Sequence, residues 1–298
     1  MNYEISHTTT YQYAHSVHQS YHLVHLTPRV VAHQVIAEHH ITVEPVPGGQ
    51  WGGVDYFGNP YSILNVEIEH NRLVVSSASK VQVHAKALLA LDETTPWRAL
   101  ARRDVPNIEQ HKDVWQFTAM SRHGPLVQAL AEYAQPSFSN NCPVLVGVAD
   151  LTRRIYEDFS FDPTATDVST PVETVLKQRR GVCQDFAHLQ IAALRSLGLP
   201  AKYVSGYILT HPPEGQQRLV GADASHAWIS TWAPECGWVD FDPTNNVIPS
   251  DEHITVAYGR DYDDVSPISG VLLGGGHHSV QVAVDVVPVQ AAEDGVGL

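Results

Sequence analysis

The sequence predicts an α+β protein in which an antiparallel β-sandwich-like domain, residues 1–95, precedes an α+β domain, residues 96–298. Three observations predict this class. Residues 2 to about 90 are rich in β-branched and aromatic residues between turn signals. Apolar positions recur at helical spacing from about 115 to 197, and strand-like runs return from about 200 to 290. Each half is long enough to bury its own core.

The first domain is expected to hold several short strands, separated by turn signals such as Pro47-Gly48-Gly49 and Gly58-Asn59-Pro60. The strand-like runs cover residues 3–13, 21–30, 34–46, 61–70 and 72–85. The spacing of the many histidines indicates no metal site, so we expect them on the surface. These histidines include His7, His15, His18, His22 and His25. We expect this domain to cover one side of a cleft or to bind a partner.

The helical part follows a connection over residues 91–115. Apolar spacing predicts helices over 125–134 and 142–161. A polar loop then leads to a short helix, for which Ser169 or Thr170 is the expected cap and Pro171 the first residue.

The stretch Arg179–Leu197 is the centre of the functional prediction. Its apolar positions predict an amphipathic helix from about Cys183 onward, so Cys183 lies in the first turn. Unpaired N–H groups and the positive end of the helix dipole favour a thiolate there, and Arg179 and Arg180 would add positive charge. Gly181 would leave the sulfur uncrowded. Without further signals, a buried structural cysteine would be the default interpretation.

Two later residues favour a catalytic role for Cys183 over a structural one. His226 opens an apolar strand, and Asp242 ends the next one before Pro243. A cysteine on a helix followed by a histidine and an aspartate on strands is an order that a thiol acyl-transfer triad can use. Asp240 competes with Asp242 for the role of the carboxylate, because alternation along a strand places both on one face.

The strands around these residues are expected over 201–209, 224–232 and 237–242, in a mostly antiparallel sheet that packs on the Cys183 helix. Residues 211–224 read as a loop. A long alternating strand near 279–289 is expected to close the edge of this sheet, which extends to about residue 290, and residues 290–298 read as a frayed end.

Three blocks of the sequence resemble the transglutaminase-like superfamily, which has a papain-like fold. They are GVCQDFAHLQIAALRSLGLPAKYVSGY, SHAWIS and GWVDFDPTNN. The first half, through YQY, HLTPR and DYFGNPYSIL, resembles the N-terminal β-region of bacterial members. The resemblance implies a catalytic domain over 96–298, with Cys183 as nucleophile, His226 as general base and acid, and Asp242 as the orienting carboxylate.

Composition limits the partners and the location. The formal net charge of −14 argues against nucleic acid and anionic membranes as partners. No apolar run is long enough for a membrane span, and the first residues do not form a signal peptide, which predicts a cytoplasmic protein. Cys142 and Cys236 are expected to have structural roles. We expect no cofactor and no metal, and the oligomeric state is left open.

The expected function is thiol-dependent hydrolysis of an amide or peptide bond through a thioester. The same triad would serve a transglutaminase, in which an amine rather than water attacks the thioester. A catalytically idle, peptide-binding module of the same fold is the third interpretation.

Overall fold

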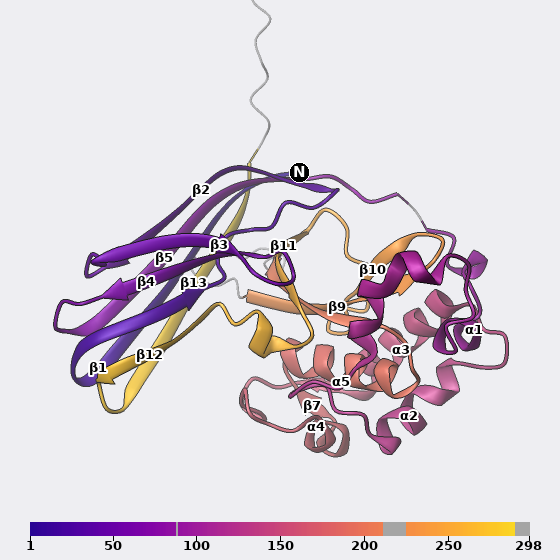
Figure 1. The fold of residues 1–298 in the computed structure, drawn as a ribbon. Coiled ribbons are helices and arrows are strands. Elements are labelled where there is room, and N and C mark those ends of the chain that lie inside the picture. Colours follow the sequence, from indigo (N-terminus) through magenta and orange to yellow (C-terminus); the bar gives the residue numbers. More distant parts are fainter. Residues whose placement is uncertain (88, 211–224, 290–298) are drawn as a thin grey trace, which may run out of the picture.

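The computed structural model describes residues 1–87, 89–210 and 225–289. A large curled sheet forms one side of the molecule, and a bundle of helices with a smaller sheet forms the other (Figure 1). The predicted fold class, an N-terminal antiparallel β-sandwich-like domain followed by an α+β core, is confirmed, and the N-terminal strands lie in one curled sheet. None of the described helices is long and apolar enough to cross a membrane.

The large sheet has seven antiparallel strands in the order β2-β5-β1-β4-β3, and β12 and β13 also pair with β1. The strands are β1 (Asn2–Val24), β2 (Gln34–Glu44), β3 (Gly49–Val54), β4 (Pro60–Val66), β5 (His70–Val83), β12 (Ile268–Gly274) and β13 (His278–Val289). The run expected at 3–13 and residues 21–24 of the run expected at 21–30 thus belong to one long strand, and residues 25–30 lie outside it. Its first half pairs with β5 and β13, and its second half with β4 and β12. β3 lies between the turn signals Pro47-Gly48-Gly49 and Gly58-Asn59-Pro60, where the sequence patterns predict no strand.

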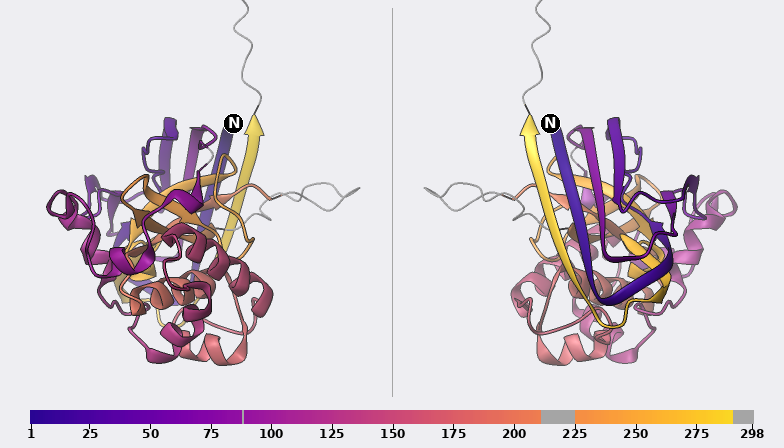
Figure 2. Two further views of the ribbon diagram at one scale, coloured as in Figure 1. Left: turned by 90° about the vertical axis from the view of Figure 1, so that its right-hand side faces the viewer. Right: turned by 90° about the vertical axis from the view of Figure 1, so that its left-hand side faces the viewer.

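The C-terminal strands belong to the N-terminal sheet, which corrects the sequence-based expectation. Residues of β13 pair with β1 from Asn2 opposite Val289 to Tyr13 opposite His278, so β13 lies beside the start of the chain (Figure 2). The smaller sheet therefore ends at Gly259 rather than near residue 290. Alternation identified the strand, but alternation does not specify which strand it pairs with. The loop expected at 211–224 and the end at 290–298 lie outside the described residues.

Several histidines of the large sheet are buried, contrary to expectation. His7, His22 and His25 are each 5% exposed or less. Burial lowers the pKa of both His7 and His22 to about 4, so these two are neutral at physiological pH. They alternate with outward residues along β1 and occupy its inner face.

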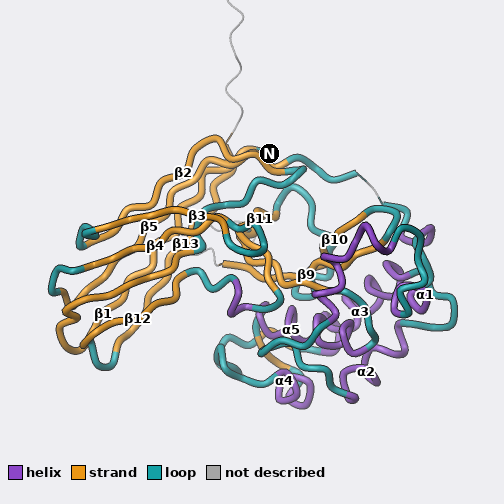
Figure 3. The backbone as a smooth tube through the Cα atoms, viewed as in Figure 1, coloured by secondary structure: helices purple, strands orange, loops and turns teal. Residues whose placement is uncertain are grey.

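The core half contains five α-helices among the described residues and a four-stranded antiparallel sheet in the order β10-β9-β8-β11 (Figure 3). The helices are α1 (Trp97–Ala101), α2 (Gln128–Ala134), α3 (Val144–Asp158), α4 (Val172–Gln178) and α5 (Cys183–Ser196). The strands are β8 (Ala201–Ile208), β9 (Ser225–Ala233), β10 (Gly237–Phe241) and β11 (His253–Gly259), and β6 (Ser160–Phe161) pairs with β7 (Arg180–Gly181). The expected helices are confirmed, but α4 begins one residue later than expected: Pro171 rather than Ser169 or Thr170 is the N-cap, and Val172 is the first helical residue. The expected connection over 91–115 contains α1 and part of a 3-10 segment, Ile108–Thr118.

The two halves share one hydrophobic core. Tyr3, Ile5 and Val83 of the large sheet belong to the same buried cluster as Phe186 and Leu189 of α5. A second cluster, which includes Leu64 and Leu73, fills the curl of the large sheet. The end of the large sheet is therefore part of the core that supports α5.

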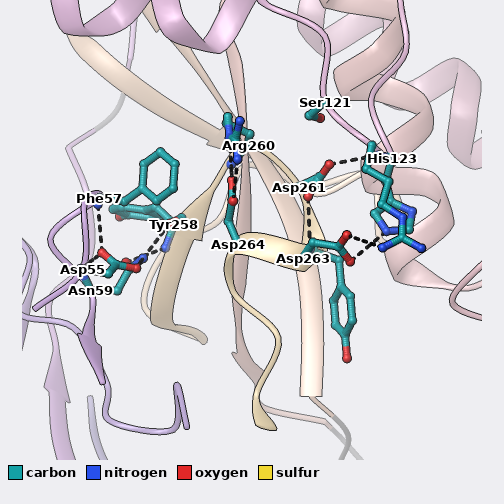
Figure 4. A network of polar contacts seen from close by, with 12 residues as sticks. Asp55, Phe57, Asn59, Ser121, His123, Tyr258, Arg260, Asp261, Asp263 and Asp264 are labelled. Carbon is teal, nitrogen blue, oxygen red and sulfur yellow. Dashed lines mark hydrogen bonds and ion pairs between the residues drawn. The ribbon is translucent and has the colours of Figure 1, made fainter. Parts of the chain in front are cut away.

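Two buried amide side chains of the large sheet complete the free edge of β11. Gln34 Nε2 donates to the Thr255 carbonyl at 2.8 Å, and the Thr255 N–H donates to Gln34 Oε1 at 2.8 Å. Asn59 repeats the pattern with the backbone of Tyr258, at 2.7 Å and 2.8 Å, beside Asp55 (Figure 4). These amides pair with backbone groups that an edge strand would leave open.

Candidate active site

Cys183 is the first residue of α5 and is partly exposed. The helix start is capped by Asp185, whose Oδ2 accepts hydrogen bonds from the Val182 N–H at 2.8 Å and from Thr166 Oγ1 at 2.6 Å. Gly181 makes room for this cap, because a Cβ atom there would lie 2.6 Å from Asp185 Oδ2. Cys183 therefore lies in the first turn of α5, where backbone N–H groups have no partner within the helix.

The two arginines before Cys183 do not act as expected. Arg179 lies 3.4 Å from Asp158, and its guanidinium stacks on the rings of Tyr133 and Phe159. Arg180 lies 3.7 Å from Asp162. The charges of both arginines are therefore compensated by aspartates. The N-terminus of α5 remains the source of positive potential for the sulfur.

His226 is the second residue of β9 and is 8% exposed. Its Nε2 lies 2.7 Å from Asp242 Oδ2, and its ring stacks on Trp228 with centroids 5.9 Å apart. Burial would lower the pKa of His226, but hydrogen bonds to Asp242 and to Cys183 outweigh it and raise this pKa to about 10. Because Asp242 engages Nε2, the nitrogen left for the thiol is Nδ1.

Asp242 is fully buried directly after β10. Its Oδ2 accepts hydrogen bonds from His226, from Asn245 Nδ2 at 2.7 Å and from His253 Nε2 at 3.1 Å. Its Oδ1 accepts the N–H groups of Thr244 and Asn245 at 2.9 Å and 3.3 Å. Burial would raise the pKa of this carboxyl, but the bonds to His226 and His253 keep it well below its usual range. The carboxylate is therefore ionised beside an imidazolium.

Asp240, the competing carboxylate, lies elsewhere. It is opposite Ser230 in the β9–β10 pairing, and its Oδ2 lies 2.7 Å from Lys86 Nζ. Both aspartates share a face, as alternation predicts, but two residues along a strand shift a side chain by about 7 Å. The structure thus brings Cys183, His226 and Asp242 together, and it joins Asp240 to a lysine.

His253 is a site residue that the sequence reasoning missed. It is buried at the start of β11, contacts Asp242, and packs edge-on against Trp228 at 5.1 Å. The alternating run HITVAYG could have indicated a strand here. The ligand atoms of His226, Asp242 and His253 lie within 4.8 Å of one another, so these three residues could also hold a metal ion.

The two other cysteines lack these features. Cys142 Sγ hydrogen-bonds to the backbone carbonyls of Ser137 and Pro143, and Cys236 is exposed in the turn between β9 and β10. Burial raises the pKa of both thiols. Both are poorer nucleophile candidates at neutral pH than a thiol paired with an imidazolium.

Comparison with known proteins identifies the family. The model of the transglutaminase-like superfamily matches residues 132–243, and the bacterial transglutaminase-like N-terminal region matches residues 3–82. A protein of Mycobacterium tuberculosis strain H37Rv is 38% identical over 296 residues, which cover 97% of this chain and 93% of that protein. The chain belongs to the transglutaminase-like superfamily.

Two further proteins resemble part or all of the chain. A protein-glutamine gamma-glutamyltransferase of Pseudomonas aeruginosa is 32% identical over 139 residues, or 45% of this chain and 20% of that protein. A crystal structure described as a "Putative Cysteine Protease" from Cytophaga hutchinsonii has a TM-score of 0.74 at 21% identity, covering 98% of this chain and 92% of that one. This transglutaminase-like chain therefore shares the architecture of that structure from end to end.

Proposed function

We propose that the protein hydrolyses amide or peptide bonds through a Cys183–His226–Asp242 triad and a thioester acyl-enzyme. The observation that carries the proposal is the position of His226, which interacts with Cys183 and hydrogen-bonds to the buried carboxylate of Asp242. In this arrangement Asp242 orients the imidazole of His226, and the protonated imidazole stabilises the thiolate of Cys183.

The steps follow from these contacts. Cys183 Sγ adds to the amide carbonyl carbon, and the carbonyl oxygen becomes an oxyanion that the first-turn N–H groups of α5 can bind. The C–N bond breaks, His226 protonates the departing amine, and the acyl group stays on sulfur. His226 then takes a proton from water, whose oxygen attacks the thioester. The carboxylic acid leaves, and the proton on His226 restores the original pair with Cys183.

Transamidation is the second candidate. It is supported by the local likeness to the Pseudomonas aeruginosa protein, whose name denotes acyl transfer from glutamine. The first half-reaction is the same, and the second differs in that a primary amine takes the place of water. We favour hydrolysis because water is always available to the thioester.

The test is a screen of glutamine-containing peptides and peptide amides, with and without a primary amine, read by mass spectrometry. Hydrolysis gives the acid or cleaved peptide, whereas transamidation gives the amine conjugate. We expect Cys183→Ala to abolish the acyl-enzyme and turnover, and Cys236→Ala, which removes an exposed thiol, to leave both unchanged. Turnover that persists in Cys183→Ala would disprove the nucleophile. No adduct and no turnover on any amide would favour the idle peptide-binding module.

The domain division near residue 95, the cytoplasmic location and the lack of nucleic-acid or membrane partners remain proposals from the sequence. The net charge of −14 supports the lack of nucleic-acid or membrane partners.

A further inference from the structure

We infer that His253 is a positioning residue for the reaction, which holds Asp242 in the orientation that His226 requires. The inference rests on the proposed function. It adds a second imidazole to the triad, from a strand that lies beyond the part of the chain matched by the superfamily model.

The first step of the argument is the hydrogen bonding of one oxygen. Asp242 Oδ2 accepts from His226, His253 and Asn245, which lie on β9, on β11 and in the turn after β10. An ionised carboxylate only accepts, so both imidazoles donate from Nε2. Hydrogen bonds from separate elements fix the rotation of the carboxylate, and a carboxylate that cannot rotate keeps Oδ2 directed at His226.

The second step is the packing of the rings. Trp228 stacks on His226 with an interplanar angle of 30° and meets His253 edge-on at 82°. Gly206 leaves space for this indole, since a Cβ there would lie 2.5 Å from Trp228 Cη2. His226, Trp228 and His253 therefore form one packed unit around Asp242. In such a unit, a displaced His253 would leave a void next to the carboxylate.

The third step concerns the titratable groups around His226 and Asp242. The groups that act most strongly on His226 and Asp242 are each other, Cys183 from α5 and His253 from β11. Asp251, which precedes β11, acts instead on Tyr3 of the large sheet. Among the titratable groups outside the Cys183–His226–Asp242 triad, His253 is thus the one that acts most strongly on the carboxylate.

The test compares His253→Phe, which keeps a ring but removes the donor, with His253→Gln, which restores an amide N–H. The matched control is His22→Phe, which replaces a buried imidazole of the large sheet. The substrate-independent readout is the alkylation rate of Cys183 by iodoacetamide, followed by peptide mass spectrometry with a chelator present to keep metal ions away. The alkylation rate of Cys236 serves as the internal standard for the activity of the reagent. Faster alkylation of Cys142 would indicate unfolding, because unfolding would expose this thiol.

We expect His253→Phe to lower the Cys183 rate and the kcat for the amide substrate roughly tenfold, with KM unchanged, as for loss of a hydrogen bond to a charged group. His253→Gln should recover most of both, and His22→Phe should change neither. An unchanged Cys183 rate and kcat in folded His253→Phe would overturn the inference. So would equal losses in the Phe and Gln variants accompanied by faster labelling of Cys142. A wild-type Cys183 that reacts no faster than Cys236 would instead overturn the proposed function, and the inference with it.

Discussion

The Nε2 atom of His226 lies 2.7 Å from Oδ2 of Asp242, and the two side chains are 8% and 0% exposed. The pair joins β9 to the end of β10 next to the first turn of α5. Because Cys183 interacts with the same imidazole, the relationship connects the thiol to a buried negative charge.

Replacement of Asp242 should mainly lower turnover, whereas replacement of Asp240 should mainly lower stability. Asp242→Asn keeps the size of the side chain but removes the charge that holds the imidazolium, so we expect kcat to fall by about 100-fold or more. Asp240→Asn should leave kcat nearly unchanged. It should lower the free energy of unfolding by about 1–3 kcal/mol, because it leaves Lys86 without its charged partner. Steady-state kinetics and urea unfolding of both variants check this. A larger loss of kcat in Asp240→Asn would make Asp240 the orienting residue.

The protonation of His226 should make stability depend on pH. Its pKa is about 10 in the folded protein and about 6.5 in an unfolded chain. The folded state therefore binds the proton more tightly, and this contribution is complete below about pH 6.5. It is lost as the pH rises to about 10. We expect the wild-type Tm to fall over this window more steeply than the Tm of His226→Gln. Parallel curves for the two proteins would contradict the assignment.

Lys202 should change the pH dependence of stability in the direction opposite to that of His226. Its amine is buried between the rings of Trp238 and Tyr258, at 4.2 Å and 3.8 Å from their centroids. Burial lowers the pKa of Lys202 to about 7, so the charged form costs stability, most of all below pH 7. We expect Lys202→Met to raise the free energy of unfolding by about 1–2 kcal/mol at pH 6. The gain should vanish near pH 10.5. Guanidinium unfolding at both pH values measures it, and a gain that grows with pH would contradict the prediction.

The amides on the edge of β11 should affect stability and turnover together. Gln34→Ala leaves the N–H and the carbonyl of Thr255 without partners, which should cost about 1–3 kcal/mol. Turnover should also fall, because β11 carries His253. Gln12→Ala is the matched control, since Gln12 is an exposed amide bonded to one carbonyl of the same sheet. Equal stabilities of the two variants would show that the edge of β11 does not depend on Gln34.

Much of this site was predictable from local signals. The helix start at Cys183 follows from periodicity and the strands of His226 and Asp242 from their apolar runs, so the order of the three residues was readable in the sequence. The choice of Asp242 over Asp240 depends on the register of β10 against β9, which alternation does not encode. His253 was missed for a related reason: its contact with Asp242 depends on how β11 pairs with β8.

In the fold, as in the site, local patterns predicted the elements but not the contacts between distant parts of the chain. Strand propensity identified most of the large sheet, but β12 and β13 pair with β1 across nearly the whole sequence. The inward histidines were also misjudged, because His7 and His22 read as polar while the alternation of β1 places them inside. For β12 and β13 the deciding factor was a neighbour distant along the chain, and for the histidines it was which face of β1 the core covers.

The pairing of β1 with β13 also sets the timing of folding. The segment 2–13 leaves the ribosome long before one of its two neighbours, which spans 278–289. Until then this flank of β1 has unsatisfied backbone groups, which is a state prone to wrong association. Completion of the sheet is therefore a late event that requires a long chain closure, and nascent chains halted before residue 278 should depend on chaperones.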